Sequence, residues 1–138
     1  MSVQETQRVL EAYAASHDAN LVAPDAIFTD TASGQQYVGR EAIAAMLHFV
    51  YHEAFDAHAE VSNLIVGDGR AVLEADIVGT HIGEFAGIPA TGLDVRIPLA
   101  VAYDISDGLV QRARVYLQLA AFLQQVTSRA QATSGRTR

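Results

Sequence analysis

The 138-residue chain contains no cysteine, and all nine of its basic residues are arginine, so it also lacks lysine. Without cysteine it cannot form a disulfide, a thiolate nucleophile, an iron–sulfur cluster or a cysteine-ligated zinc site. Without lysine it cannot form a Schiff base, attach pyridoxal phosphate or bind phosphate through a Walker-type lysine. These two absences exclude several classes of enzyme before any motif is considered.

The chain is also short of positive charge, with a formal net charge of −7 at pH 7. A strongly acidic surface repels a nucleic-acid backbone and an anionic membrane. No apolar run approaches the ~20 residues of a membrane span, and the first residues, Met1 to Glu5, lack the basic and apolar regions of a signal peptide. We therefore expect a cytoplasmic protein that binds neither nucleic acid nor membrane.

Hydrophobic periodicity predicts helices first and long strands afterwards. Apolar residues at helical spacing predict helices at 3–16 and 41–55, with a short helix capped by Asp18 between them. Alternation of apolar and polar residues predicts strands, at 26–30, 36–38, 57–66, 71–77, 95–103 and 109–118. Residues 120–126 either form a terminal helix or extend the last strand.

This order of elements predicts an α+β fold with helices on one face of a strongly bent, mostly antiparallel sheet. No composition shift divides the chain, so residues 1–127 are expected to form a single domain. Residues 128–138 are small, polar and arginine-bearing, and we expect them to form a disordered tail.

The most distinctive stretch, residues 79–92, connects two of the long strands and reads Gly-Thr-His-Ile-Gly-Glu-Phe-Ala-Gly-Ile-Pro-Ala-Thr-Gly. Extending the alternation of the preceding strand places His81 on the buried side. A neutral imidazole there could accept a proton or donate a hydrogen bond to a carbonyl oxygen. It could equally be a core histidine bonded to the backbone, and the pattern leaves both interpretations open.

This stretch, with Asp107-Gly108-Leu109-Val110 and the strand ending Arg114-Val115-Tyr116, resembles the SnoaL-like polyketide cyclases of the nuclear transport factor 2-like superfamily. The resemblance covers most of residues 5 to 127. It implies a cone-shaped α+β barrel whose N-terminal helices enclose a cavity, and homodimers paired across the outer face of the sheet. It also implies cofactor-independent acid/base chemistry, of the lyase or isomerase type, on a small, apolar, enolisable substrate.

The chain departs from this family at the catalytic carboxylate. The family's final strand points an aspartate, and a tyrosine two residues before it, into the cavity; here Tyr116 matches the tyrosine but Gln118 replaces the aspartate. A neutral amide cannot abstract a proton, although it can orient an enol or carbonyl oxygen. Asp30 is the leading substitute as base and His81 the other candidate, but Asp30 could instead bond the backbone of the turn that follows it.

Five further side chains are expected to bind substrate: Tyr13, Tyr37 and Tyr116 as phenol donors, Arg114 as a cation, and Phe85 of the distinctive stretch. His48 and His52 have the spacing of a two-histidine metal site. They lie opposite the apolar stripe of their predicted helix, without a third ligand, so no metal site is expected.

Three functions are compatible with these features. The first is a cyclase- or isomerase-type enzyme, with dehydration or epoxide hydrolysis as variants of the same chemistry. The second is a non-catalytic small-molecule-binding or accessory protein that has lost the aspartate. The third is a purely dimeric interaction module, which predicts a cavity filled by side chains.

Overall fold

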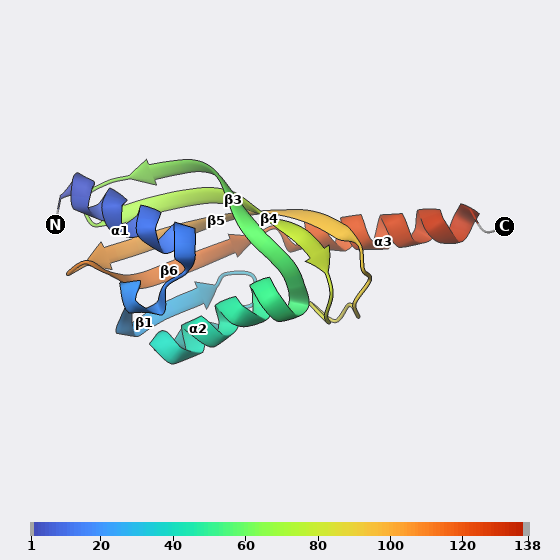
Figure 1. Ribbon diagram of the computed structural model, residues 1–138, viewed down its shortest axis with the longest axis horizontal. Coiled ribbons are helices and arrows are strands. Elements are labelled where there is room, and N and C mark those ends of the chain that lie inside the picture. The colour runs from blue at the N-terminus through green and yellow to red at the C-terminus, as the bar shows by residue number, and fades with distance from the viewer. Residues whose placement is uncertain (1, 137–138) are drawn as a thin grey trace.

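The computed structural model describes the backbone of residues 2–136 and the side chains of residues 2–127. The first part of the chain contains the helical elements with two strands between them, and four consecutive strands follow before a last helix (Figure 1). In chain order the elements are α1 (Val3–Ser16), the 3-10 helix η1 (Ala19–Leu21), β1 (Val22–Asp30), β2 (Gln36–Val38), α2 (Arg40–His48), the π-helix η2 (Phe49–Ala54), β3 (Phe55–Val66), β4 (Arg70–His81), β5 (Asp94–Ser106), β6 (Leu109–Leu117) and α3 (Leu119–Arg136).

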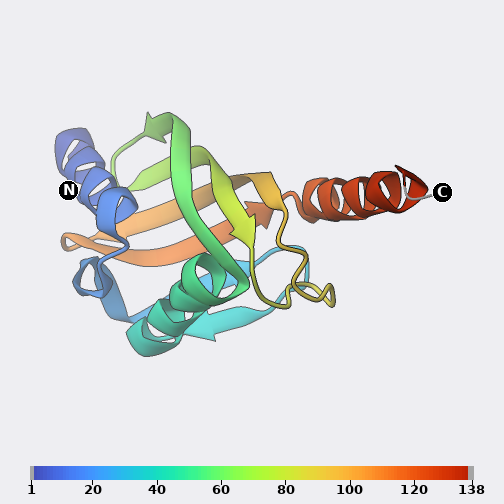
Figure 2. The ribbon, with the colours of Figure 1, turned by 45° about the vertical axis from the view of Figure 1, so that its right-hand side comes forward.

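The strands form one sheet in the order β2-β1-β6-β5-β4-β3. Only the β1–β6 pair is parallel, and the other four pairs are antiparallel. The sheet bends strongly, and α1 and α2 lie on its concave side (Figure 2). The predicted α+β fold, with a bent, mostly antiparallel sheet and helices over one face, is confirmed. No helix in the described part of the chain is long and apolar enough to cross a membrane.

Several predicted boundaries differ from the structure, and three of the differences are substantial. β1 begins at Val22 rather than at residue 26 and passes through Pro24; its pairing with β6 is irregular between Val22 and Ile27, which accommodates a residue without an N–H. The helix predicted at 41–55 is α-helical only to His48 and continues as a π-helix. The terminal segment is a helix, and its backbone stays helical to Arg136, across most of the segment predicted to be a disordered tail. Residues 137–138 lie outside the described residues.

The core consists of the inner faces of the sheet and the helices that cover them. Along β4, Ala71, Leu73, Ala75 and Ile77 are buried while their neighbours are not, as the alternation predicted. One cluster of buried residues joins these strands to α1 and α2. A second joins η2, the adjoining ends of the strands, and Phe122 and Val126 of α3.

The first turns of α3 dock where the sheet is incomplete. β6 ends opposite Leu99, so Arg96 of β5 has no β6 residue beside it. The side-chain amide of Gln125 fills that place: its Oε1 accepts the backbone N–H of Arg96 at 2.8 Å, and its Nε2 donates to the Arg96 carbonyl at 2.6 Å. One glutamine thus stands in for a strand partner, while Phe122 beside it is fully buried.

Candidate active site

A cavity of about 110 Å³ lies between the concave face of the sheet and the helices α1, α2 and η2. Aliphatic and aromatic side chains provide most of its lining, from Phe28 of β1 to Leu117 of β6. Val61 of the edge strand β3 is the most exposed lining residue, at 46%. The cavity therefore opens to solvent beside β3. Because side chains leave this space open, the interaction-module interpretation, which predicts a filled cavity, is not supported.

Four polar side chains line this apolar space: Tyr13 and His17 of α1 and its C-terminal cap, Tyr51 of η2, and Tyr103 of β5. Their rings are neighbours. Ring centroids are 5.9 Å apart for Tyr13 and Tyr103, 5.4 Å for Tyr13 and His17, and 4.9 Å for His17 and Tyr51. Within residues 2–127, whose side chains are described, no Asp, Glu or Arg lines the cavity. We call these four residues the polar end of the cavity.

The three phenols of the polar end remain protonated and can act as hydrogen-bond donors. Burial raises the pKa of Tyr51 to about 12 and raises the pKa values of Tyr13 and Tyr103 well above their usual value. Among the described residues, none of the three hydroxyl groups has a hydrogen-bond partner. Three hydroxyl donors that bond no described residue and keep access to the cavity offer a place for the oxygen atoms of a ligand.

His17 reaches the cavity because of its backbone conformation. It caps the C-terminus of α1 with φ 50° and ψ 38°, in the left-handed region, and its N–H donates to the carbonyl oxygen of Tyr13 at 2.6 Å. Glycine or asparagine usually occupies such a cap. Burial, and secondly the nearby His52, lower the pKa of His17 below its ordinary value, so its ring is neutral at pH 7.

The distinctive stretch at 79–92 supports the polar end from outside it. The backbone N–H groups of Ile82 and Gly83 both donate to the carbonyl oxygen of Ala54, at 2.9 and 3.0 Å, which fixes the C-terminal end of η2. Gly83 lies so close to η2 that a Cβ there would overlap the carbonyl oxygen of Glu53. This stretch therefore helps to hold the π-helix that carries Tyr51.

His81 is fully buried, as the alternation predicted, but it does not line the cavity. Its Nδ1 accepts the backbone N–H of Thr91 at 3.3 Å and lies 2.9 Å from the Oγ1 of the same residue. Its ring packs against Phe55 and Phe122, at centroid distances of 5.3 and 5.1 Å. The observed contacts hold the two ends of the 79–92 stretch together. A catalytic role for His81 stays a prediction that its position does not support.

Asp30 bonds the turn that follows it, which was the alternative to a role as base. Its Oδ1 accepts the backbone N–H of Ala32, and its Oδ2 accepts the hydroxyl of Ser33, both at 3.0 Å. It does not line the cavity. Its assignment as base also stays an untested prediction, and the structure gives this carboxylate a turn-forming role.

The expectation that the even-numbered face of the last strand lines the cavity is wrong. Val115 and Leu117 of β6 line it, whereas Arg114, Tyr116 and Gln118 lie on the outer face of the sheet. Tyr116 is 46% exposed, and Arg114 forms an ion pair with Asp104 at 3.3 Å. The alternation of apolar residues along this strand favours the observed orientation, but the prediction followed the family pattern instead. The predicted roles of these three side chains therefore lack support from their positions.

Two of the predicted substrate-binding residues, Tyr13 and Phe85, do line the cavity, and Tyr37 does not. The sequence interpretation missed His17, Tyr51 and Tyr103. The sequence could have indicated that Tyr103 points inward, because it lies on the apolar side of its alternating strand. Nothing in the sequence marked the π-helix that turns Tyr51 inward, or the left-handed cap at His17.

Solved structures whose sequences are about 20% identical to this chain share its fold. One is provisionally named a SnoaL-like polyketide cyclase, from Jannaschia sp. CCS1; it has a TM-score of 0.79 and 20% identity over 89% of this chain and 92% of that one. AclR from Streptomyces galilaeus, provisionally a hydroxylase, has a TM-score of 0.76 and 20% identity over 92% of this chain and 98% of that one. A provisional polyketide cyclase from Xanthomonas campestris pv. campestris has a TM-score of 0.78 and 20% identity over 90% of this chain and 98% of that one.

These identities establish a common fold and no common reaction. No curated protein matches the sequence. The sequence model of the SnoaL-like polyketide cyclases, in contrast, matches residues 2–126, from the start of α1 to the docked turns of α3. That range contains every element that lines the cavity, and the chain therefore belongs to the SnoaL-like polyketide cyclase family.

Proposed function

We propose that this protein is a cofactor-independent enzyme of the cyclase or isomerase type, which removes a proton next to a carbonyl group of a small apolar substrate. Family membership supports this general class of activity. The observation that carries the proposal is the polar end of the cavity, where Tyr13, Tyr51 and Tyr103, together with His17, line an otherwise apolar space.

The apolar lining supplies binding energy for a hydrocarbon ring, and the phenols supply donors for its carbonyl oxygen. When a base removes the neighbouring proton, the C–H electron pair becomes a carbon–carbon double bond and negative charge moves to the oxygen. Hydrogen bonds to that oxygen strengthen as its charge grows, most of all where water is excluded. The same enolate can attack a second carbonyl group to close a ring, or be reprotonated elsewhere to complete an isomerisation.

The size and charge of the cavity restrict the substrate. Its volume of about 110 Å³ is close to that of an engineered apolar cavity of about 150 Å³ that binds benzene. One benzene-sized ring therefore fits inside, and the second ring of a fused bicyclic substrate extends past Val61 toward solvent. Because no arginine with a described side chain lines the cavity, it suits a ketone or an ester better than a free carboxylate.

The absence of a carboxylate from the cavity lining favours one alternative, a small-molecule-binding protein without turnover. The two functions differ in a single measurable step. An enzyme of the proposed class exchanges the hydrogen atoms next to a carbonyl group with solvent, whereas a binding protein does not.

The test is deuterium uptake in heavy water, followed by mass spectrometry, with 2-tetralone, 2-indanone and ethyl benzoylacetate as probes. We expect the wild type to accelerate exchange of at least one probe above the uncatalysed rate. Tyr51→Phe should lower that rate by about 100-fold, the typical effect of losing one donor to the developing oxyanion. Tyr37→Phe is the matched control, because this tyrosine lies outside the cavity, and should leave the rate unchanged. Binding of the probes without any acceleration would establish the alternative.

A further inference from the structure

The polar end contains one group that can exchange a proton near neutral pH, and it is His17. The three phenols hold their protons, and the described part of the chain contributes no carboxylate to the cavity lining. Among the described residues, neither ring nitrogen of His17 has a hydrogen-bond partner, although the ring is half-buried against Tyr13 and Tyr51. A half-buried imidazole that bonds none of the described residues is available to a ligand.

We propose that His17 is the acid/base group of this site and replaces the aspartate that the chain lacks at Gln118. The inference rests on the proposed function, since it names the base for the same reaction. It also assigns catalysis to the end of α1, a different part of the fold from the last strand.

The backbone at His17 supports the assignment. A side chain with a Cβ seldom adopts φ 50°, and such conformations cluster at functional sites. Glycine would satisfy the cap of α1 without steric strain. The histidine at this position instead places an imidazole 4.9 Å from the ring of Tyr51, within the polar end.

In the proposed step, a neutral ring nitrogen of His17 takes the proton from the carbon next to the substrate carbonyl. The C–H electron pair forms the carbon–carbon double bond, and the oxygen receives the charge and the hydrogen bonds of the phenols. The imidazolium then returns its proton to carbon or to oxygen. Protons and electrons balance without any cofactor.

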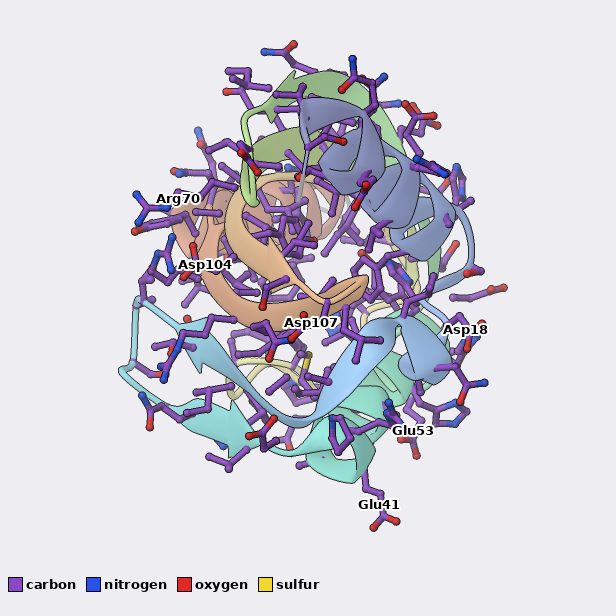
Figure 3. The ribbon with its side chains drawn as sticks, turned by 90° about the vertical axis from the view of Figure 1, so that its left-hand side faces the viewer. Asp18, Glu41, Glu53, Arg70, Asp104 and Asp107 are labelled. Carbon is purple, nitrogen blue, oxygen red and sulfur yellow. The ribbon has the colours of Figure 1, made fainter. Side chains whose placement is uncertain are left out.

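The groups that face His17 allow this proton transfer near neutral pH. Tyr13 lies on its own helix, and Tyr51 and His52 face it from η2. Figure 3 shows Asp18 and Glu53, the acidic residues next in sequence to His17 and His52, at the outside of the molecule. Asp18 caps η1 by accepting the N–H of Asn20 at 2.9 Å. Burial and His52 therefore dominate, and both lower the pKa of His17.

The first experiment measures exchange of 2-tetralone by the full-length wild type, His17→Asn and His17→Gly. Both replacements tolerate a left-handed cap, so the helix end keeps its backbone. We expect each to lower the rate by at least 100-fold, the size of a general-base contribution. Both should still bind 2-naphthol, whose ring and oxygen match the enol of 2-tetralone. Free imidazole should restore part of the rate of His17→Gly beyond its own effect in solution.

The second experiment is the pH profile of exchange. The wild-type rate should rise with pH through a midpoint below 6.5, the ordinary pKa of histidine, and then stay level, because the neutral ring is the active form. His52→Gln removes the charge that helps to lower the pKa of His17, so it should move this midpoint to higher pH. His48→Gln is the matched control, since His48 is exposed one turn earlier, and should leave the midpoint unchanged.

The outcomes separate the two proposals. A wild type that binds 2-naphthol and accelerates no exchange overturns the proposed function itself. A wild type that accelerates exchange, together with His17→Gly or His17→Asn variants that do so equally well, overturns only the role of His17. A midpoint that His52→Gln does not move would also contradict that role.

Discussion

Replacing Tyr103 with phenylalanine should lower activity and at the same time leave the protein as stable as before, or slightly more stable. Tyr103 is 5% exposed, and burial holds its hydroxyl in the protonated form. That hydroxyl has no partner among the described residues, so Tyr103→Phe breaks no hydrogen bond within the chain. The ring keeps its packing against Tyr13, at a centroid distance of 5.9 Å.

The magnitudes follow from that arrangement. A buried hydroxyl without a hydrogen bond costs roughly 1–3 kcal/mol, and water in the cavity reduces this cost. We therefore expect the free energy of unfolding to rise by about 0 to 1 kcal/mol, or by up to about 4 °C in melting temperature for a chain of this size. A tyrosine whose hydroxyl is hydrogen-bonded would instead lose about 1 kcal/mol. Activity should fall by about 100-fold, because one donor to the developing oxyanion is lost.

Urea denaturation and deuterium exchange with 2-tetralone, measured on the same preparations, give both numbers. Tyr37→Phe again serves as the control, since its hydroxyl lies away from the cavity. Loss of more than about 1 kcal/mol of stability with an unchanged exchange rate would mean that Tyr103 has a structural role, and the reasoning about the polar end would fail.

Three shorter predictions test the rest of the structure. Gly83→Ala should destabilise the protein by about 2 kcal/mol in urea denaturation, because its methyl group would meet the carbonyl oxygen of Glu53; an unchanged midpoint would contradict the close contact with η2. Gln118→Asp should not raise the exchange rate, because this side chain is on the outer face, and a clear increase would place it in the cavity after all. We propose a homodimer across that face, so sedimentation should give twice the 14.8 kDa chain mass for the wild type and a monomer for Tyr116→Arg; a monomeric wild type would refute the dimer.

The elements of this fold could be predicted because each long strand buries one face. The alternation that starts at Ala71 placed His81 in the core, and the apolar stripes of the first two helices placed them over the sheet. The same rule, applied to Val115 and Leu117, gives the observed orientation of the last strand. The error at Tyr116 and Gln118 came from preferring the family's pattern to the residues themselves.

The candidate site was harder to predict because its parts are far apart in the sequence and their orientation depends on irregular backbone. Tyr13, Tyr51 and Tyr103 belong to three different elements, and only the curved sheet brings their rings together. A π-helix has a different number of residues per turn from an α-helix, so helical spacing could not place Tyr51. His17 follows the last residue of α1 and belongs to no periodic pattern.

The most direct test of the central claim, that the polar end recognises the oxygen of an enol, is a comparison of two ligands by fluorescence titration. 2-Naphthol and naphthalene share one ring system and differ by a single hydroxyl group. If the phenols bind that oxygen, the wild type should bind 2-naphthol about 10 to 100 times more tightly than naphthalene, as one or two hydrogen bonds of about 1.5 kcal/mol each would give. Tyr13→Phe/Tyr51→Phe/Tyr103→Phe should abolish the difference. Equal affinities in the wild type would show that the cavity recognises only hydrocarbon, and the account of its chemistry would be wrong.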